Sequence, residues 1–185
     1  MLYVFGFDRV GVVVGDLYFV DPEPSTGQES AEHGVRLELR VLERGELKDS
    51  IYSATPIEVG QPVWRADFLE SVDGKPGSFD RAHHHPAFTG WNPGKRVFVR
   101  ELSADPLGWL AGKLADLDAL LAEARFPVDT AGPADAVDLR DAAPEVVGAT
   151  RRLLDRVRAG ELGKAPAEVP AATDGRPVLV RSGWL

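Results

Sequence analysis

Hydrophobic and polar positions in the N-terminal part of the chain follow the short apolar runs and strict alternation that are typical of β-structure. Leu2 to Phe7, Val10 to Val14 and Leu17 to Val20 are apolar enough to predict three strands, with Gly15-Asp16 as a tight hairpin turn between the last two. Apolar and charged residues alternate from Val35 to Leu42, which predicts a strand with one buried face.

Further strands are predicted from Ser50 to Val59 and from Val63 to Leu69, with a break at Gly60 to Pro62. A last strand is predicted from Lys95 to Leu102. The segment from Asp21 to Gly34 is rich in proline, glycine and serine, so we expect a long exposed loop there.

The pattern changes at Asp105-Pro106, an N-cap residue followed by a proline suited to a first helical turn. Leucines then recur at helical spacing, at positions Leu107, Leu110, Leu114, Leu117 and Leu121. This stripe predicts one helix that ends before Pro127, followed by a connection from Phe126 to Ala143. A second helix is predicted from Pro144 to a stop at Gly160.

Strands first and helices second indicate an α+β fold, with a mainly antiparallel β-sheet from the N-terminal ~100 residues and two C-terminal amphipathic helices packed on it. A β-barrel or sandwich with appended helices is the alternative. We expect a single domain over 1–185, with a β-rich part (1–104), two helices (105–160) and a linker-like tail (161–185) with a possible edge strand at 177–181.

Composition narrows the function classes. The chain has no cysteine, which excludes disulfides, thiolate metal ligands and cysteine nucleophiles and fits a cytoplasmic protein. No apolar segment is long enough to span a membrane, and the N-terminus lacks the basic leader of a signal peptide. A net charge of −8 argues against a broad nucleic-acid-binding face.

The segment from Arg81 to Arg100 reverses this acidic character. It contains no acidic residue, carries a formal charge of +4 and holds three of the four histidines, at positions 83 to 85. Its glycines, prolines and Asn92 are turn-forming residues, so the segment also fits a solvated loop without any ligand. We nevertheless take it as the candidate site of the chain.

One hypothesis for this segment is a metal site. Alternate residues of a strand share a face, so His83 and His85 point together and His84 points away. Two imidazoles at this spacing can bind zinc, and no other cofactor is expected from the sequence. The candidates for a third ligand are Asp80, His33, Asp67 and Glu70. The neighbouring cations disfavour a bound cation, so the sequence ranks the metal site below an anion site.

The second hypothesis is an anion site on a hairpin made by the two strands of the segment. In one register parity, five side chains share a face that can grip a phosphate or carboxylate: Arg81, His83, His85, Arg96 and Arg100. In the other parity the first three lie opposite the last two and no site forms. The register therefore decides whether the site exists.

The function expected from these features is a non-catalytic binding or interaction module with a His/Arg anion-binding surface. Its partner would be a protein or an anionic small molecule, with Trp91 at the predicted loop tip as a candidate contact residue, and homo-oligomerisation is compatible with this function. The alternative is a metal-dependent or histidine-based hydrolase acting on a phosphorylated or carboxylated substrate. No nucleophile elbow, phosphate-binding loop or dinucleotide motif supports that alternative.

Overall fold

An open five-stranded antiparallel sheet forms the centre of the fold. The structure, a computed structural model, describes residues 1–45 and 56–166. The strands follow one another in the order of the sequence: β1 (Leu2–Gly6), β2 (Val10–Phe19), β3 (Glu32–Arg44), β4 (Ile57–Ser71) and β5 (His83–His85). A small hairpin of β6 (Phe88–Thr89) and β7 (Asn92–Pro93) lies beyond β5.

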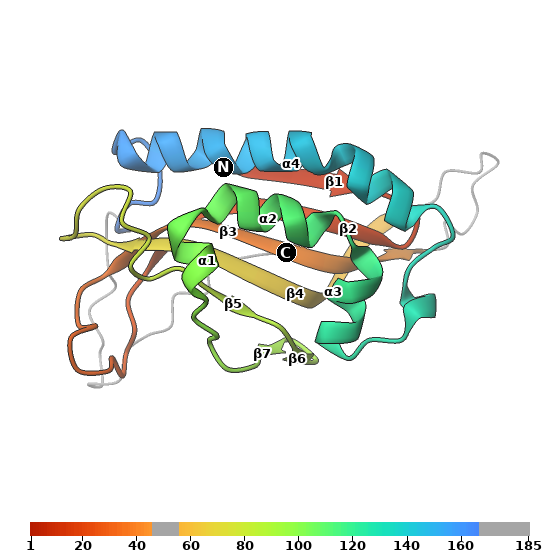
Figure 1. The fold of residues 1–185 in the computed structure, drawn as a ribbon, viewed down its shortest axis with the longest axis horizontal. Coiled ribbons are helices and arrows are strands. Elements are labelled where there is room, and N and C mark those ends of the chain that lie inside the picture. The colour runs from red at the N-terminus through yellow and green to blue at the C-terminus, as the bar shows by residue number, and fades with distance from the viewer. Residues whose placement is uncertain (46–55, 167–185) are drawn as a thin grey trace.

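The helices cover one face of this sheet. They are α1 (Arg100–Ala104), α2 (Pro106–Leu114), α3 (Leu117–Ala124), the short 3-10 helix η1 (Val128–Thr130) and α4 (Asp135–Arg158). The long helix α4 packs against β2 and β3, α3 packs against β4, and α2 packs against α4 (Figure 1). The predicted α+β class is confirmed, and the barrel alternative is not supported because β1 and β5 end the strand order without pairing to each other.

Alternation along β3 and β4 separates an apolar face from a polar face. The side chains that face the helices are completely buried: Val35, Leu37, Leu39, Trp64, Ala66 and Phe68. They pack with helix residues such as Leu110, Leu121 and Leu153 in one hydrophobic core. The residues between them in β3, Arg36, Glu38 and Arg40, point to the other face of the sheet. The candidate site lies on that polar face.

Two of the predicted turns are instead strand interior. Gly15-Asp16 is not a hairpin turn, because β2 runs through it and Gly15 pairs with Leu2 on one side and Arg36 on the other. Gly60 to Pro62 does not break β4 but adjoins a register shift opposite Arg40, an irregularity at which a proline is tolerated in a sheet. Residues 46–55, which include the start of the strand predicted from Ser50, lie outside the described part.

The loop predicted from Asp21 to Gly34 ends earlier, because β3 already begins at Glu32 and pairs with Phe19 of β2. Gly34 lies inside the ladder rather than in a loop. A Cβ atom at this position would lie 2.1 Å from the carbonyl oxygen of Phe68, so only glycine allows β3 and β4 to approach this closely. His33 is consequently a strand residue on the face opposite Arg36.

The helical boundaries also differ from those predicted. The leucine stripe is divided into α2 and α3, because α2 ends at Leu114 and Asp116 caps a new helix by accepting a hydrogen bond from the backbone N–H of Ala119. The strand predicted from Lys95 to Leu102 is reduced to one bridge, between His84 and Val97, before α1 begins. Helix α4 begins at Asp135, so Pro144 lies inside it rather than at its start.

The early start of α4 is explained by Asp135, whose side chain is completely buried. Its carboxylate accepts hydrogen bonds from three backbone N–H groups: those of Asp8 at 2.7 Å, Arg9 at 3.1 Å and Gly132 at 2.6 Å. The carboxylate therefore ties the turn between β1 and β2 to the first turn of α4. Asp8 and Arg9 are more than 120 residues from Asp135 in the sequence, and Gly132 precedes the helix. Helical periodicity therefore does not reveal these hydrogen bonds.

Within the described residues, no helix has both the length and the hydropathy needed to cross a bilayer. The predicted edge strand at 177–181 and most of the tail lie outside the described part, and nothing tests them.

Candidate metal site

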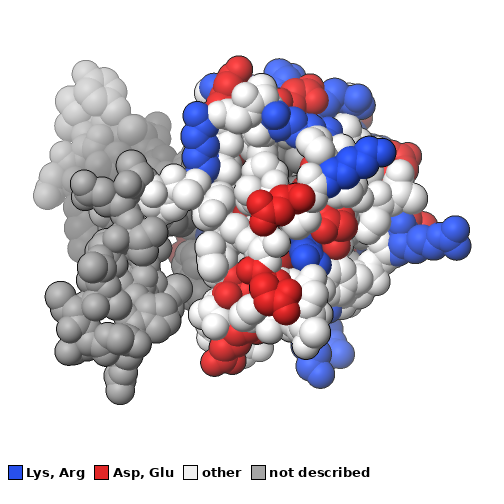
Figure 2. Space-filling model, turned by 90° about the vertical axis from the view of Figure 1, so that its left-hand side faces the viewer, with Lys and Arg blue, Asp and Glu red and all other residues white. Residues whose placement is uncertain are grey.

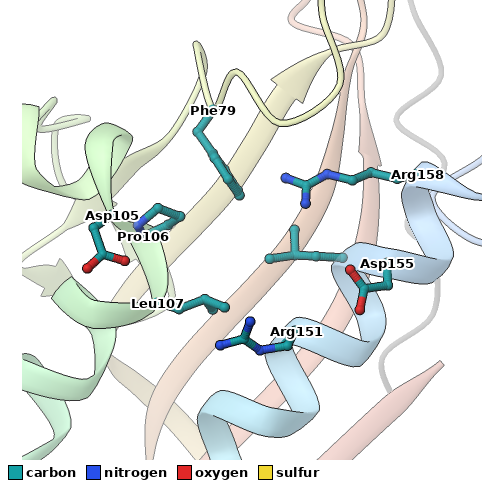
Figure 3. Close-up of a pocket in the computed structure, with 8 residues that line it drawn as sticks. Phe79, Asp105, Pro106, Leu107, Arg151, Asp155 and Arg158 are labelled. Atoms are coloured by element: carbon teal, nitrogen blue, oxygen red, sulfur yellow. The ribbon is translucent and has the colours of Figure 1, made fainter.

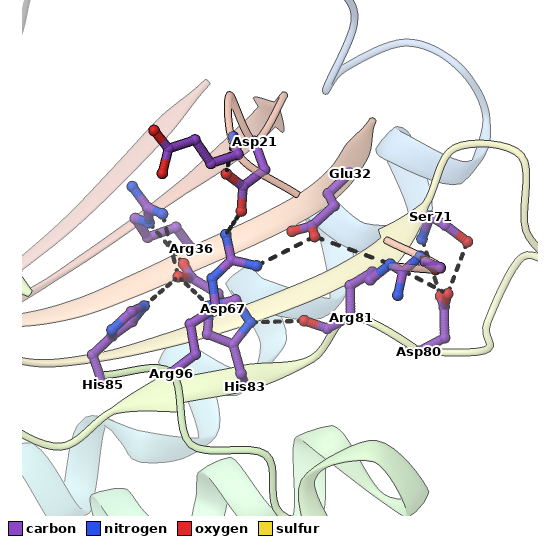
Figure 4. Close-up of polar contacts among 12 residues, drawn as sticks. Asp21, Glu32, Arg36, Asp67, Ser71, Asp80, Arg81, His83, His85 and Arg96 are labelled. Atoms are coloured by element: carbon purple, nitrogen blue, oxygen red, sulfur yellow. Dashed lines mark hydrogen bonds and ion pairs between the residues drawn. The ribbon is translucent and has the colours of Figure 1, made fainter. Parts of the chain in front are cut away.

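Three side chains from two neighbouring strands converge on the polar face of the sheet. Asp67 of β4 pairs with His83 of β5, and Arg65 pairs with His85, so alternation points both histidines to the face that carries Asp67. The Asp67 Oδ2 atom lies 3.4 Å from His83 Nε2 and 3.5 Å from His85 Nε2 (Figure 4). One potential ligand atom from each residue lies within 4.8 Å of the other two.

The second nitrogen of each imidazole is held by a backbone carbonyl. His83 Nδ1 lies 2.8 Å from the carbonyl oxygen of Arg81, and His85 Nδ1 lies 2.8 Å from that of Gly94. A carbonyl oxygen only accepts hydrogen bonds, so each Nδ1 carries the proton and donates it. In the neutral imidazole this assignment leaves the lone pair on Nε2, the nitrogen that faces Asp67.

Asp67 is completely buried and is held by a guanidinium fork. Arg36 Nε donates to Oδ1 at 2.7 Å, and Arg36 Nη2 donates to Oδ2 at 3.2 Å. Burial raises the pKa of Asp67, whereas the positive charge and the hydrogen bonds of Arg36 lower it, and the net direction is well below the ordinary value. The carboxylate is therefore ionised at neutral pH.

His84 occupies the other face of β5, in the hydrophobic core. Its ring lies 5.3 Å from Trp109 and 6.1 Å from Trp64, measured between ring centroids, and these two indoles stack on each other at 5.8 Å. Burial lowers the pKa of His84, partly offset by the carboxylate of Glu123. The division of the histidine triplet, two to the polar face and one to the core, follows the alternation expected for a strand.

The bridge between His84 and Val97 determines the register on which the anion hypothesis depends. It places Arg96 and Phe98 on the face of His83 and His85, and the rings of His83 and Phe98 lie 5.4 Å apart. Arg100 does not join them, because it begins α1 and is exposed to solvent. Arg81 lies on the same side, next to the end of the sheet (Figure 4).

The arginines of the anion hypothesis already have carboxylate partners. Arg96 lies 3.4 Å from Glu32 Oε1 and 3.4 Å from Asp21 Oδ2. Arg81 Nε lies 3.7 Å from Asp80 Oδ2 and 4.0 Å from Glu32 Oε1. Burial raises the pKa of Glu32, although the charges of Arg96 and Arg81 oppose this shift. Two of the four cations of the segment are thus paired with acids from outside it.

Of the four candidates for a third metal ligand, only Asp67 lies beside both histidines in the structure. Asp67 completes the group, whereas Asp80 accepts hydrogen bonds from Ser71 and Ser78 at the end of β4. Glu70 is paired with Arg158 of α4. His33 lines a separate cavity of about 490 Å³ near the end of α4. A lone acid in an apolar strand such as Val63 to Leu69 is a signal that sequence reasoning could have ranked higher.

Trp91 lies at the turn between β6 and β7 and remains 63% exposed, so it does not join the core. The guanidinium of Arg40 lies 5.2 Å from the centre of its ring. Trp64, by contrast, is fully buried, as expected from its place in an apolar strand, and Trp109 packs between the helices and the sheet.

A second cavity, of about 280 Å³, lies between the start of α2 and α4 (Figure 3). Arg151 and Arg158 border it, but Asp105 and Asp155 also border it, and Arg158 is paired with Glu70. On the side drawn in Figure 2, the described basic and acidic side chains are interspersed and no continuous basic surface forms. Neither observation favours a nucleic-acid partner.

Comparisons with family models, curated proteins and solved structures find no match for this chain. The chemistry of the site therefore rests on its own residues.

Proposed function

We propose that this protein binds a divalent first-row transition-metal ion, with zinc as the first candidate, through Asp67, His83 and His85. The supporting observation is that two imidazole nitrogens with available lone pairs approach one carboxylate oxygen. Ligand atoms ~2.0–2.2 Å from a tetrahedral zinc ion lie roughly 3.3–3.6 Å from one another. The 3.4 Å and 3.5 Å separations between Asp67 Oδ2 and the two Nε2 atoms match this spacing.

The surroundings of the three ligands support the same function. Metal-binding histidines usually donate their second N–H to a carbonyl or carboxylate, as both histidines do here. The two Nε2 atoms and the Asp67 carboxylate face one another at these separations, and a cation among them would interact with all three.

Two of the cations that disfavoured a metal site in the sequence analysis do not oppose it in the structure. Arg81 and Arg96 are paired with Glu32, Asp21 and Asp80 rather than directed at the histidines. Arg36 donates to both oxygens of Asp67, more closely to Oδ1 than to Oδ2, and an Oδ2 atom that accepts one hydrogen bond still has a lone pair for an ion. The arginine then acts as an outer partner that orients the carboxylate.

Addition of zinc to metal-free protein without a purification tag is expected to give one bound ion per chain and to raise the unfolding temperature. At a free zinc concentration ~100 times the dissociation constant, binding to the folded state alone adds about 2.7 kcal/mol to the free energy of unfolding. Isothermal titration and thermal unfolding measure the two effects. A stoichiometry well below one, with no thermal shift for zinc, cobalt, nickel, manganese or iron(II), would rule out the metal site.

A metal-dependent hydrolase is the second candidate function, and the observation that favours it is the number of protein ligands. Three ligands leave a coordination position at which zinc can activate water. The zinc-loaded protein should then hydrolyse 4-nitrophenyl phosphate or 4-nitrophenyl acetate faster than free zinc does. Equal rates for the loaded protein and for free zinc would contradict the hydrolase and leave the binding function.

A further inference from the structure

The polar face next to the three ligands carries more positive than negative charge. Among residues 1–45 and 56–166, Arg36, Arg40 and Arg65 share two carboxylates, those of Asp67 and Glu38. Glu38 is held from both sides, with Oε2 at 2.6 Å from Arg40 Nη2 and Oε1 at 2.6 Å from Arg65 Nη2. Four of these five side chains are at most 16% exposed, and Arg36 is 31% exposed. An excess charge in such a setting is only weakly screened by water.

The sheet register brings two of these arginines next to the proposed ligands. Arg36 is the cross-strand partner of Asp67, and Arg65 is the cross-strand partner of His85. Arg36 and Arg65 are themselves diagonal neighbours on β3 and β4, since Arg65 pairs with Glu38, two residues beyond Arg36. Two guanidinium groups of like charge therefore adjoin the point on which the imidazoles converge.

We infer that this face also binds a small oxyanion, a carboxylate or phosphate group, between Arg36 and Arg65 and at the open coordination position of the proposed ion. Guanidinium N–H groups are charged donors that suit the oxygens of both anions. Asp67 and Glu38 engage Nε and Nη2 of Arg36 and of Arg65, so the Nη1 group of each is the donor offered to the anion. Arg40 does not take part, because its remaining Nη1 donates to the carbonyl oxygen of Gly60 at 2.9 Å. The coordination to the ion rests on the proposed function, whereas the guanidinium contacts do not.

The charge balance also supports an anion at this point. Arg36, Arg40 and Arg65 carry three positive charges, against the two carboxylates of Asp67 and Glu38 with which they pair. A divalent ion would add two more positive charges to the same face, and an anionic ligand would offset part of this charge. The residues differ from the predicted anion site, since Arg81 and Arg96 are neutralised by acids and Arg100 lies in α1.

The test measures binding of inorganic phosphate and of malonate, separately, to metal-free protein and to zinc-loaded protein from which free zinc has been removed. Both forms should bind at least one of the two anions, and the preferred anion tells a phosphate-bearing ligand from a carboxylate-bearing one. The zinc-loaded form should bind it at least about tenfold more tightly, a difference of ~1.4 kcal/mol.

Arg65→Gln should weaken anion binding at least about tenfold in both forms, as expected for loss of a charged hydrogen-bonding group. Arg65→Lys keeps the charge but loses the planar guanidinium, so its anion affinity should lie between those of Arg65→Gln and the wild type. It replaces the glutamine variant if that variant does not fold. Arg44→Gln is the matched control, because Arg44 is also on β3 but is 58% exposed and paired with Asp8. It should leave anion binding unchanged.

No anion binding to either form up to roughly 10 mM, far above the range of specific ligands, would overturn the oxyanion site. Equal losses in Arg65→Gln and Arg44→Gln would overturn it as well. Anion binding that depends on Arg65 in a protein that takes up no metal would support the oxyanion site and reject the metal proposal. Zinc uptake without anion binding would support the metal proposal and reject the oxyanion site.

Discussion

Replacement of His85 by alanine is expected to lower the affinity for zinc by at least about 100-fold, the upper end of the loss seen when only an outer partner of a ligand is removed. The variant loses one of three protein ligands and leaves Asp67 and His83, which hold an ion weakly. Isothermal titration of metal-free wild type and variant measures the ratio directly. The variant should also lose the zinc-dependent rise in unfolding temperature.

His33→Ala is the matched control, because it removes a histidine from the opposite face of β3. It should bind zinc as the wild type does. Comparable zinc affinities in His85→Ala and the wild type would refute the proposed ligand set, and so would an equal loss in His33→Ala. Circular dichroism spectra of both variants show whether the fold is retained.

Replacement of Asp135 by alanine is expected to lower the free energy of unfolding by about 4 kcal/mol, because each hydrogen bond to a buried charged group contributes ~1.5–3 kcal/mol. The variant would leave the backbone N–H groups of Asp8, Arg9 and Gly132 without their carboxylate acceptor. Urea unfolding followed by circular dichroism measures the change in midpoint and slope. Zinc affinity should change little, since the described contacts of Asp135 are all distant from β5.

Asp138→Ala separates the role of these hydrogen bonds from that of negative charge near the start of a helix. Asp138 lies in the same first turn of α4 but is exposed. Its loss should lower the free energy of unfolding by only ~0.3–1 kcal/mol, the usual size of a charge–dipole effect. Similar changes for Asp135→Ala and Asp138→Ala would contradict the role assigned to the buried carboxylate.

The strands were predictable wherever period-two alternation was present, and the α+β class followed from the order of strands and helices. β3 is the clearest case, since its alternating residues lie on the two faces as expected. The predicted boundaries of strands and helices were wrong where a polar or turn-forming residue has a partner that is distant in the sequence. Gly15 pairs with Leu2 and Arg36, and Asp135 bonds to Asp8 and Arg9, so in both cases long-range contacts override the local signal.

The candidate site was predictable in part. Alternation correctly separates His84 from His83 and His85, and Asp67 was among the candidates for a third ligand. Its selection over Glu70 and Asp80 needed the pairing of β4 with β5, which no spacing in the sequence encodes. Arg36 and Arg65 were not predicted as site residues, because a charged residue on an alternating strand is normally exposed to solvent. Only the strand register brings these two beside the histidines.

The two faces of β5 also have an optical consequence. The backbone of this three-residue strand separates the proposed ion from His84, which touches the stacked indoles of Trp64 and Trp109. A bound paramagnetic ion such as copper(II) would therefore lie close enough to quench the emission of two buried fluorophores. With the proposed ligands, the two indoles would report ion binding from the opposite side of the sheet.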